Sequence, residues 1–428
     1  MAEEAALSTI RTDLRGLNPL HTAYSAQCDA VAIHSKGASD QRRRHLTLVA
    51  LALGTFCIGT SEFASMGIIQ LFSSDLGISV PEGTNAITAY ATGVVIGAPL
   101  ITLLAARLNR RTLLLALMAL FAVGNLLSGF VGSLHWLMAA RFLSGMPHGA
   151  YFGAGAVVAS YIVGPGHSGK AFAVVMLGLT VATIFGSPLA TFLGQTLGWR
   201  QTFMVVGLLS VCSFLAILAW VPKTKDLDGG PVMQELATLK RPSVWVAMLV
   251  AASGVSSVFA VYTFIGPMTT DAAHLGAGMV PVALGIFGLG MTTGNLVGGR
   301  LADRHPALGI LVGFGSALPV LAALALGGEQ KWVLLPCLFG VGATMMAAIP
   351  TIQVRMTRFA PEAPALMGAM NLAALNVANA LGAWAGALVV ERGYGLLSAA
   401  WAGFALTLFG LIIIGLRVLF GPKLKPSG

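Results

Sequence analysis

Long apolar segments recur along the whole chain, and they restrict it to one kind of architecture. A helix that crosses a bilayer needs roughly 20 mostly apolar residues. Segments of about this length fall near residues 46–72, 85–106, 112–132, 135–161, 170–195, 201–221, 244–268, 281–302, 308–327, 332–353, 365–390 and 395–417. Because irregular backbone cannot face lipid, each segment should be a helix. The sequence therefore predicts an all-α integral membrane protein with twelve transmembrane helices.

The composition agrees with a membrane protein and excludes several other classes. Of the residues, 56% are hydrophobic and 10% charged, whereas soluble domains have about 25% charged residues. The net charge of +9 does not indicate nucleic-acid binding, because the basic residues form short clusters between apolar segments. The four cysteines lack metal-ligand spacing, and no P-loop pattern is found. We therefore expect neither a metal, nor a cofactor, nor ATP as the energy source.

A polar linker divides the chain into two sets of six spans. The stretch PKTKDLDGGPVMQELATLKRPS at 222–243 is charged and contains proline and glycine. It predicts an N-terminal half at 46–221 and a C-terminal half at 244–420. Residues 1–45 have no apolar signal region, so they are expected to be a disordered cytoplasmic tail. Residues 421–428 form a second short tail.

The positions of lysine and arginine predict the orientation of the spans. Of the 25 basic residues, only Arg200, Lys331 and Arg392 fall on one side of the predicted membrane, and Arg141 lies within a span. All others fall on the side of the two termini. Since cytoplasmic loops carry the excess of basic residues, both termini should be cytoplasmic.

The two halves also repeat in sequence. GAPLITLLAARLNRR, from Gly97 to Arg111, corresponds to GNLVGGRLADRHPAL, from Gly294 to Leu308. VATIFGSPLATFLG in the fifth span resembles VANALGAWAGALVV in the eleventh. Two pseudo-symmetric six-helix halves are typical of secondary transporters, whose substrate sites lie at the interface of the repeats.

These motifs resemble those of the major facilitator superfamily. The loop LAARLNRR, with Arg107 and Arg111, has Ala106 where that family usually has aspartate, whereas LADRHPAL keeps Asp303 and Arg304. The fourth span, LMAARFLSGMPHGA, resembles the pattern of proton-coupled members, and GTSEF, GAPL and PHGAYFG are most similar to the arabinose-efflux-type branch of the drug:proton antiporter-1 family. The resemblance implies a multi-pass, monomeric exporter in a bacterial inner membrane.

Three residues are candidates for proton coupling: Glu62, Arg141 and His148. Glu62 and Arg141 are the two firmly charged residues within the spans, where a charge costs at least about 2.5–3.5 kcal/mol. Arg141 and His148 are seven positions apart, so both lie near one helix face, and Pro147 is expected to kink that helix beside His148. In the predicted mechanism, Glu62 takes a proton from outside and releases it inside, assisted by Arg141 and His148. Alternatively, Glu62 anchors helix 1, Arg141 holds backbone carbonyls, and His148 only packs.

A second set of candidates is expected to line the substrate cavity, because the resemblance places their helices there. They are Tyr151, Phe152, Tyr262, Phe264, Met345, Met346, Asn371, Asn376 and Trp384. Aromatic walls with a few amides suit a small neutral, zwitterionic or cationic compound. Simple packing or contact with lipid is the alternative for each residue.

A third set is expected to act in gating and helix packing. It comprises Gly97, Arg107, Arg111, Gly178, Gly186, Pro188, Gly194, Gly294, Asp303 and Arg304. The glycines and the proline of the fifth span would allow close packing or bending against the eighth span. The glycines expected to face them from that span are Gly285, Gly288, Gly290 and Gly294. Asp303 should lie near Ser168, Gly169 and Lys170, where it could latch the outward-facing state.

The sequence thus predicts proton-coupled export of a small molecule by alternating access, and no enzymatic activity. The expected partners are the substrate, protons and the lipid bilayer. A proton symporter or a uniporter for uptake is the alternative within transport. A receptor on the same fold would bind ligand without flux, and a membrane enzyme would need a polar cluster at one membrane face, which the sequence does not show.

Overall fold

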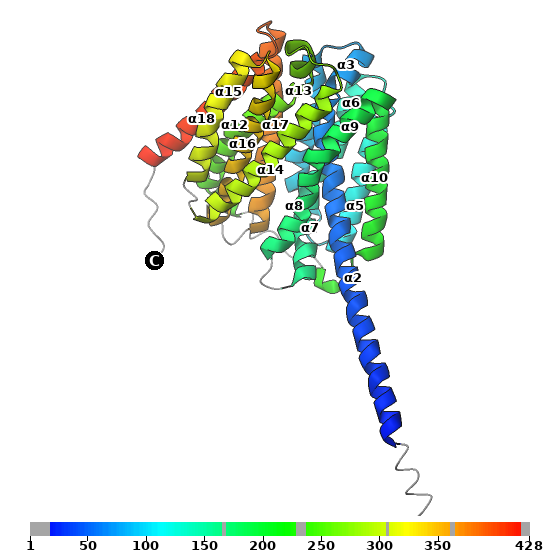
Figure 1. Ribbon diagram of the computed structural model, residues 1–428. Coiled ribbons are helices and arrows are strands. Elements are labelled where there is room, and N and C mark those ends of the chain that lie inside the picture. The colour runs from blue at the N-terminus through cyan, green and yellow to red at the C-terminus, as the bar shows by residue number, and fades with distance from the viewer. Residues whose placement is uncertain (1–17, 165–167, 228–236, 305–307, 360–363, 421–428) are drawn as a thin grey trace, which may run out of the picture.

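The computed structural model describes residues 18–164, 168–227, 237–304, 308–359 and 364–420, which form a bundle of long helices (Figure 1). In this part of the chain, 11 helices are long and apolar enough to cross a membrane. The remaining predicted span, 135–161, is present as two shorter helices that meet at Met146 and Pro147. The predicted all-α membrane fold with twelve spans is therefore confirmed.

The first six spans form the N-terminal half. Its helices are α2 (Asn18–Gly67), α3 (Ile69–Leu76), α4 (Val80–Leu104), α5 (Arg110–Ser128), α6 (Leu134–Gly145), α7 (His148–Val163), α8 (Ser168–Val181), a π-helical segment (Ala182–Gly186), α9 (Ser187–Leu197) and α10 (Trp199–Trp220). The fifth span remains helical from α8 to α9, with one π-helical turn between these two α-helices. Such turns often mark functional positions.

The last six spans form the C-terminal half. Short 3-10 turns at Lys225–Leu227 and Ala237–Lys240 lead into α12 (Pro242–Tyr262), α13 (Ile265–Pro267), a π-helical segment (Met268–Ala272), α14 (Met279–Arg304), α15 (Leu308–Gly327), α16 (Lys331–Phe359), α17 (Pro364–Glu391) and α18 (Ser398–Phe420). The halves meet where α4 and α7 contact α17, and where α9 contacts α14.

The first helix is longer than the sequence analysis predicted. α2 begins at Asn18, so it includes residues 18–45, which were assigned to a disordered tail. Its membrane-crossing part is Gln41–Gly67. After Pro19 this stretch contains no further proline, and a helix once started adds residues at little cost. Residues 1–17 lie outside the described part of the chain.

Side-chain caps fix the start of two helices. Ser79 accepts a hydrogen bond from the Glu82 N–H, and the Glu82 carboxylate accepts one from the Ser79 N–H, so α4 begins with a capping box. Asn109 accepts from the Arg111 N–H at the start of α5. Asparagine is among the favoured N-cap residues, so Asn109 fixes the residue at which α5 begins.

Glycines bring α4 into direct contact with α6. A Cβ atom at Gly93 would lie 2.2 Å from the carbonyl oxygen of Phe142, and one at Gly97 would lie 2.3 Å from that of Met146. Any larger residue would force the two backbones apart. The predicted packing role of Gly97 therefore has a definite geometry.

The C-terminal half repeats this contact between α14 and α16. A Cβ atom at Gly290 would lie 2.2 Å from the carbonyl oxygen of Phe339, and one at Gly294 would lie 2.0 Å from that of Ala343. The helix breaks repeat as well, because Ile68 before α3 and Phe264 before α13 share φ −107° and ψ 11°. The pseudo-symmetry inferred from sequence thus extends to backbone contacts.

Replacing Gly97 by alanine should destabilise the protein, because the added methyl group would overlap the Met146 carbonyl oxygen. Overpacking of this kind costs about 1–3 kcal/mol, and thermal unfolding of the purified protein measures it. Gly153→Ala is the matched control, since a Cβ atom there meets no atom within 4 Å. Equal melting temperatures for the two variants would contradict the close contact.

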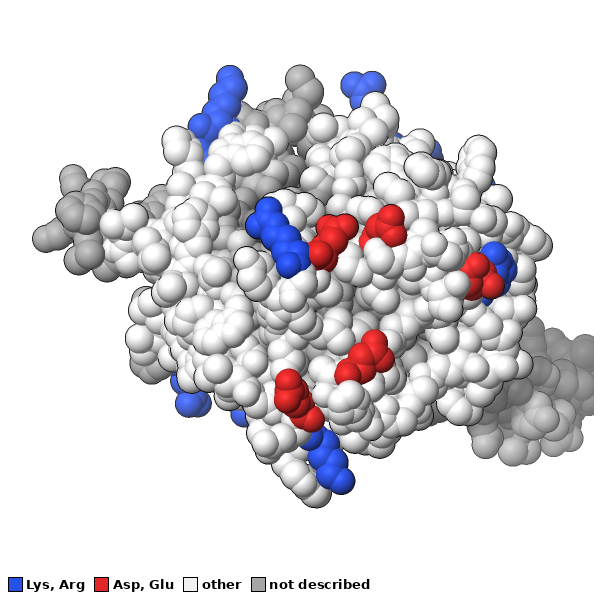
Figure 2. All heavy atoms as spheres, turned by 90° about the horizontal axis from the view of Figure 1, so that it is seen from above, with Lys and Arg blue, Asp and Glu red and all other residues white. Residues whose placement is uncertain are grey.

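The end of the bundle opposite to the start of α2 carries few charges (Figure 2). One polar cluster there joins α3 to α10. The Asp75 carboxylate accepts hydrogen bonds from Arg200 and from Trp199 Nε1, the latter at 3.1 Å. These bonds, with that from Arg200 the larger influence, lower the pKa of Asp75. The guanidinium of Arg200 also stacks on the Trp199 ring at 4.3 Å.

Replacing Asp75 by asparagine should lower the melting temperature slightly at neutral pH, because exposed ion pairs contribute little. A lowered pKa means that the carboxylate stabilises the fold above its unfolded-state pKa and loses this effect as the pH falls through the folded-state value. The difference between wild type and Asp75→Asn should therefore disappear in acid. A difference that persists unchanged there would show that the charge of Asp75 is not responsible.

Candidate functional site

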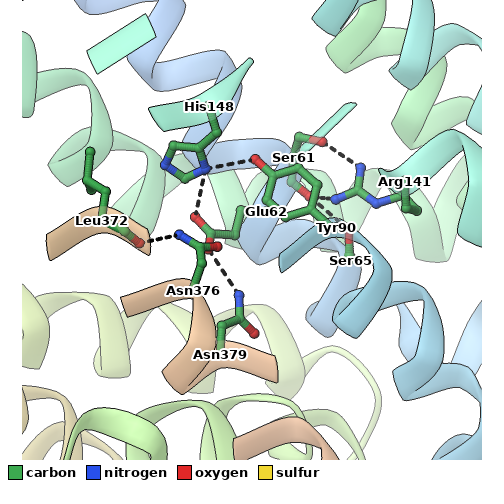
Figure 3. Close-up of polar contacts among 9 residues, drawn as sticks. All are labelled: Ser61, Glu62, Ser65, Tyr90, Arg141, His148, Leu372, Asn376 and Asn379. Carbon is green, nitrogen blue, oxygen red and sulfur yellow. Dashed lines mark hydrogen bonds and ion pairs between the residues drawn. The ribbon is translucent and has the colours of Figure 1, made fainter. Parts of the chain in front are cut away.

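Glu62 lies deep in the bundle, between the two halves. It belongs to α2, and its residue is 6% exposed. Its Oε1 accepts a hydrogen bond of 3.1 Å from Nδ2 of Asn379, which belongs to α17 of the other half (Figure 3). The one carboxylate that the sequence placed deep within a span therefore connects the N-terminal half directly to the C-terminal half.

His148 approaches the same carboxylate from the break in the fourth span. It is the first residue of α7, directly after Pro147, and its Nδ1 lies 4.0 Å from Oε2 of Glu62. The same nitrogen lies 3.1 Å from the hydroxyl of Tyr90 on α4 (Figure 3). The kink expected at Pro147 takes the form of a break between α6 and α7, and it allows an imidazole to face Glu62 from the start of a new helix.

Arg141 is held by a different set of contacts. Its Nη1 donates to Oγ of Ser61 at 2.8 Å, and its Nη2 donates to the carbonyl oxygen of Ser61 at 3.1 Å. The guanidinium carbon lies 4.5 Å from the ring centroid of Tyr90 and 5.0 Å from that of Phe203. Stacking between aromatic rings suits a planar guanidinium, so these contacts fix Arg141 within the N-terminal half.

Arg141 is linked to Glu62 indirectly, through other residues. Among the described residues, His148 is the only basic side chain within 4.0 Å of the Glu62 carboxylate. Arg141 reaches Glu62 through the backbone of its neighbour Ser61 and through the ring of Tyr90, whose hydroxyl contacts His148. The structure thus brings all three predicted residues into one buried network, while their role in proton coupling stays a prediction.

Several members of this network were not among the sequence candidates. Tyr90 and Ser61 link Arg141 to the acid, Asn125 of α5 contacts both Ser61 and Arg141, and Asn379 bonds Glu62 itself. These residues could have been identified in the sequence by their polarity within apolar spans, since a polar group at bilayer depth requires a partner. Sequence alone gave no means to pair Asn379 with an acid 317 positions away.

The predicted cavity residues separate into two groups. Phe152 lies beside His148, with ring centroids 5.1 Å apart, and the Tyr262 ring packs between Phe63 and Phe287. Asn371 and Asn376 are buried, and neither Oδ1 atom has a hydrogen-bond partner in the described structure.

The other predicted cavity residues lie elsewhere. The Tyr151 hydroxyl donates to the carbonyl oxygen of Leu51 inside the N-terminal half. Phe264 and Met345 belong to a buried apolar cluster that includes residues of both halves, Met346 packs against that cluster, and Trp384 is 55% exposed. The structure does not bring these residues to Glu62, and their contact with substrate stays a prediction.

The fifth span makes close contact with the first, through glycines that the sequence analysis expected to face the eighth span. Cβ atoms at Gly178, Gly186 and Gly194 would lie 2.0 Å from the Ala52 carbonyl oxygen, 2.2 Å from Thr60 Oγ1 and 2.7 Å from Ile68 Cγ2. Each of these glycines therefore lets the fifth span approach the first span closely.

The fifth span meets the eighth at the π-helical turn. A Cβ atom at Gly288 of α14 would lie 2.3 Å from the Thr183 carbonyl oxygen, and one at Gly285 would lie 3.8 Å from Pro188. Gly290 and Gly294, which the sequence also assigned to this contact, pack on α16 instead, because they lie on the other face of α14. That part of the packing prediction was wrong.

The charged gating candidates lie near the ends of their helices. Arg111 donates from Nη2 to the Leu218 carbonyl oxygen at 2.7 Å, while Arg107, Asp303 and Arg304 are exposed. The side chain of Lys170 is outside the described residues, so the proposed latch between Asp303 and the start of α8 stays a prediction.

Two halves of six spans, with a buried polar network between them, form the architecture of a secondary transporter. Comparison with known families supports this class, since residues 51–383 match the Major Facilitator Superfamily. The chain belongs to this superfamily and is a multi-pass membrane transporter, not an enzyme.

Characterised and curated relatives cover nearly the whole transporter. The chain is 39% identical to the inner membrane transport protein YdhP of Escherichia coli, over 84% of this chain and 94% of that protein. It is 35% identical to a chloramphenicol resistance protein of Streptomyces lividans, over 86% and 95%. A bacterial homologue of the human lysosomal transporter Spinster, solved inward-facing and occupied, shares the fold with a TM-score of 0.69 and 14% identity, over 90% and 99%.

Replacing Arg141 by lysine should destabilise the protein even though the charge is kept. An ammonium cannot hold the two Ser61 acceptors in a fixed fork while stacking between two rings, and charged hydrogen bonds contribute about 1.5–3 kcal/mol. Thermal unfolding should show a clear loss for Arg141→Lys. The exposed Arg42→Lys variant is the control, and equal stability of both variants would contradict the clamp.

Proposed function

We propose that the chain exports a small organic compound in exchange for protons, and that Glu62 carries the proton. The observation that supports this most strongly is the position of Glu62. It is buried at the interface of the halves and bonded across it to Asn379. A membrane-embedded carboxylate is costly unless it is paired or takes up a proton, so its protonation state is coupled to its surroundings.

The hydrogen bond between Glu62 and Asn379 suggests how a proton would affect the halves. An ionised Glu62 only accepts hydrogen bonds, and Asn379 Nδ2 supplies one at 3.1 Å. A protonated Glu62 becomes a donor as well, and His148 Nδ1 at 4.0 Å is the nearest basic nitrogen. Loading a proton therefore weakens the contact with α17 and favours one within the N-terminal half.

We infer the following cycle from this change. A proton arriving from outside neutralises Glu62, the two halves rock, and the proton leaves to the cytoplasm. Substrate moves outward in the opposite step. Arg141, fixed by Ser61, Tyr90 and Phe203, supplies a constant positive charge near the acid without leaving its position.

Export is favoured over uptake by the names of relatives. One is a chloramphenicol resistance protein and another is a probable sugar efflux transporter of Pasteurella multocida, 26% identical over 87% of this chain. Uptake by a proton symporter or a uniporter is the second candidate. Location in a bacterial inner membrane, cytoplasmic termini and a monomeric state belong to the proposal, supported by the basic-residue bias and the name of the Escherichia coli relative.

Glu62→Gln should abolish transport driven by a pH gradient, because the amide keeps the size of the side chain but carries no exchangeable charge. The measurement is substrate flux in proteoliposomes with an imposed gradient, beside wild type. Glu329→Gln, which changes an exposed acid, should behave like wild type. Full gradient-driven flux in Glu62→Gln would refute the proton role, and wild-type flux that ignores the gradient would favour the uniporter.

A further inference from the structure

We propose that the site beside Glu62 recognises an organic ammonium ion through its N–H groups, with amide oxygens of α17 as additional acceptors. This inference rests on the proposed export function and names the substrate class. It is carried by buried oxygen atoms that lack partners, and by a carboxylate that has no arginine or lysine within 4.0 Å among the described residues.

Two asparagines present free acceptors at the acid. Asn376 donates from Nδ2 to the Leu372 carbonyl oxygen at 3.0 Å, and Asn379 donates to Glu62 at 3.1 Å. These bonds leave both Oδ1 atoms without a partner, although the residues are only 4% and 0% exposed. Figure 3 shows Asn376 and Asn379 extending from α17 to the same side as Glu62 and His148. Buried acceptors without partners are rare and costly.

A third free acceptor lies along the same helix. The Oδ1 atom of Asn371 is also buried without a partner. Five residues separate it from Asn376, which places it about 7.5 Å nearer to the end of the bundle where α2 begins. The three amides therefore lie at successive depths along α17, from that end toward Glu62, with Asn371 on a different face of the helix from Asn376.

The charge at the site favours a cation. Among the described residues, the only ionisable basic group within 4.0 Å of Glu62 is His148, and Arg141 is occupied by Ser61. A buried carboxylate needs a compensating positive charge or a proton. An ammonium group carries three donors and no acceptor, which matches in number the carboxylate of Glu62 and the two unpartnered amide oxygens of Asn376 and Asn379.

A polyol fits these observations less well. Its hydroxyl groups also need donors for their own lone pairs, and it would leave the charge of Glu62 uncompensated. Phe152, stacked beside His148 at 5.1 Å, instead offers an aromatic surface for the apolar body of an amine. Cations and aromatic rings attract each other in addition.

The carboxylate of Glu62 would then bind a proton and the substrate in turn. The titratable or charged side chains around it are His148 of α7, Tyr90 of α4, Arg141 of α6 and Tyr262 of α12. None of them supplies Glu62 with a close permanent cation. Binding of either a proton or an ammonium ion excludes the other, which is the requirement for exchange.

Calorimetric titration of the purified full-length protein, at one neutral pH and without any gradient, tests this. The probes are 2-phenylethylammonium, its N-trimethyl analogue, 2-phenylethanol, phenylacetate and a pentose. We expect the primary ammonium to bind at least about tenfold more tightly than the trimethyl analogue, because the latter has no N–H donors. The alcohol, the anion and the sugar should bind more weakly still.

Variants of the amides distinguish hydrogen bonding from charge alone. Asn376→Leu should weaken binding of the primary ammonium about tenfold while leaving the trimethyl analogue unchanged. Asn376→Asp keeps an acceptor and should retain the preference for the primary ammonium, which also controls for misfolding. Gln330→Leu alters an exposed amide in the turn before α16 and should change nothing.

Several results would overturn the inference. These are equal binding of the primary and trimethyl ions, preference for the pentose or the anion, or no binding of any aryl-alkyl ammonium in a series of increasing size. The outcome is separable from that of the proposed function. If ammonium binding requires Glu62 but no gradient-driven flux is found, this inference stands and proton exchange is refuted. If a pH gradient instead drives the flux of neutral compounds, proton exchange stands and this inference is refuted.

Discussion

The close contact of α4 with α6 is the constraint on which the polar network depends. Gly93 and Gly97 allow the two backbones to touch, and Gly145 allows the return contact with the Tyr90 carbonyl oxygen. At this separation the Tyr90 ring can stack on Arg141 while its hydroxyl reaches His148. A looser pair of helices would move Tyr90 away from both the guanidinium and the imidazole, and Glu62 would lose its ordered surroundings.

The network assigns different physical tasks to its two charged residues. Arg141 has hydrogen-bond acceptors and two aromatic rings around it, so its guanidinium is stabilised locally and its position is fixed. Glu62 has one amide donor, and that donor belongs to the other half. The acid is therefore the member whose bonding changes when the halves move, while the arginine keeps the same neighbours.

Much of the fold could be predicted from the sequence, because span length, basic-residue bias and glycine spacing are local signals. The twelve spans, the repeat and the break at Pro147 follow from them. The first helix extended further than expected, since polarity was taken as a sign of disorder.

The candidate site was predictable only in part. Glu62, Arg141 and His148 stand out as polar residues in apolar spans, but the contact with Asn379 depends on how two distant helices pack. For the same reason Gly290 and Gly294 were assigned to the wrong neighbour, since spacing identifies a small-residue face without identifying what covers it.

The repeat has a consequence for how such a protein can evolve. Both halves share the same glycine contacts, yet the acid, the arginine and the histidine all lie in one half, while the amides with unpartnered oxygens lie on α17 of the other. Substitutions on α17 can therefore change these amides while Arg141 and its neighbours remain intact. A duplicated scaffold with its ionisable groups in one copy leaves the second copy free to diversify.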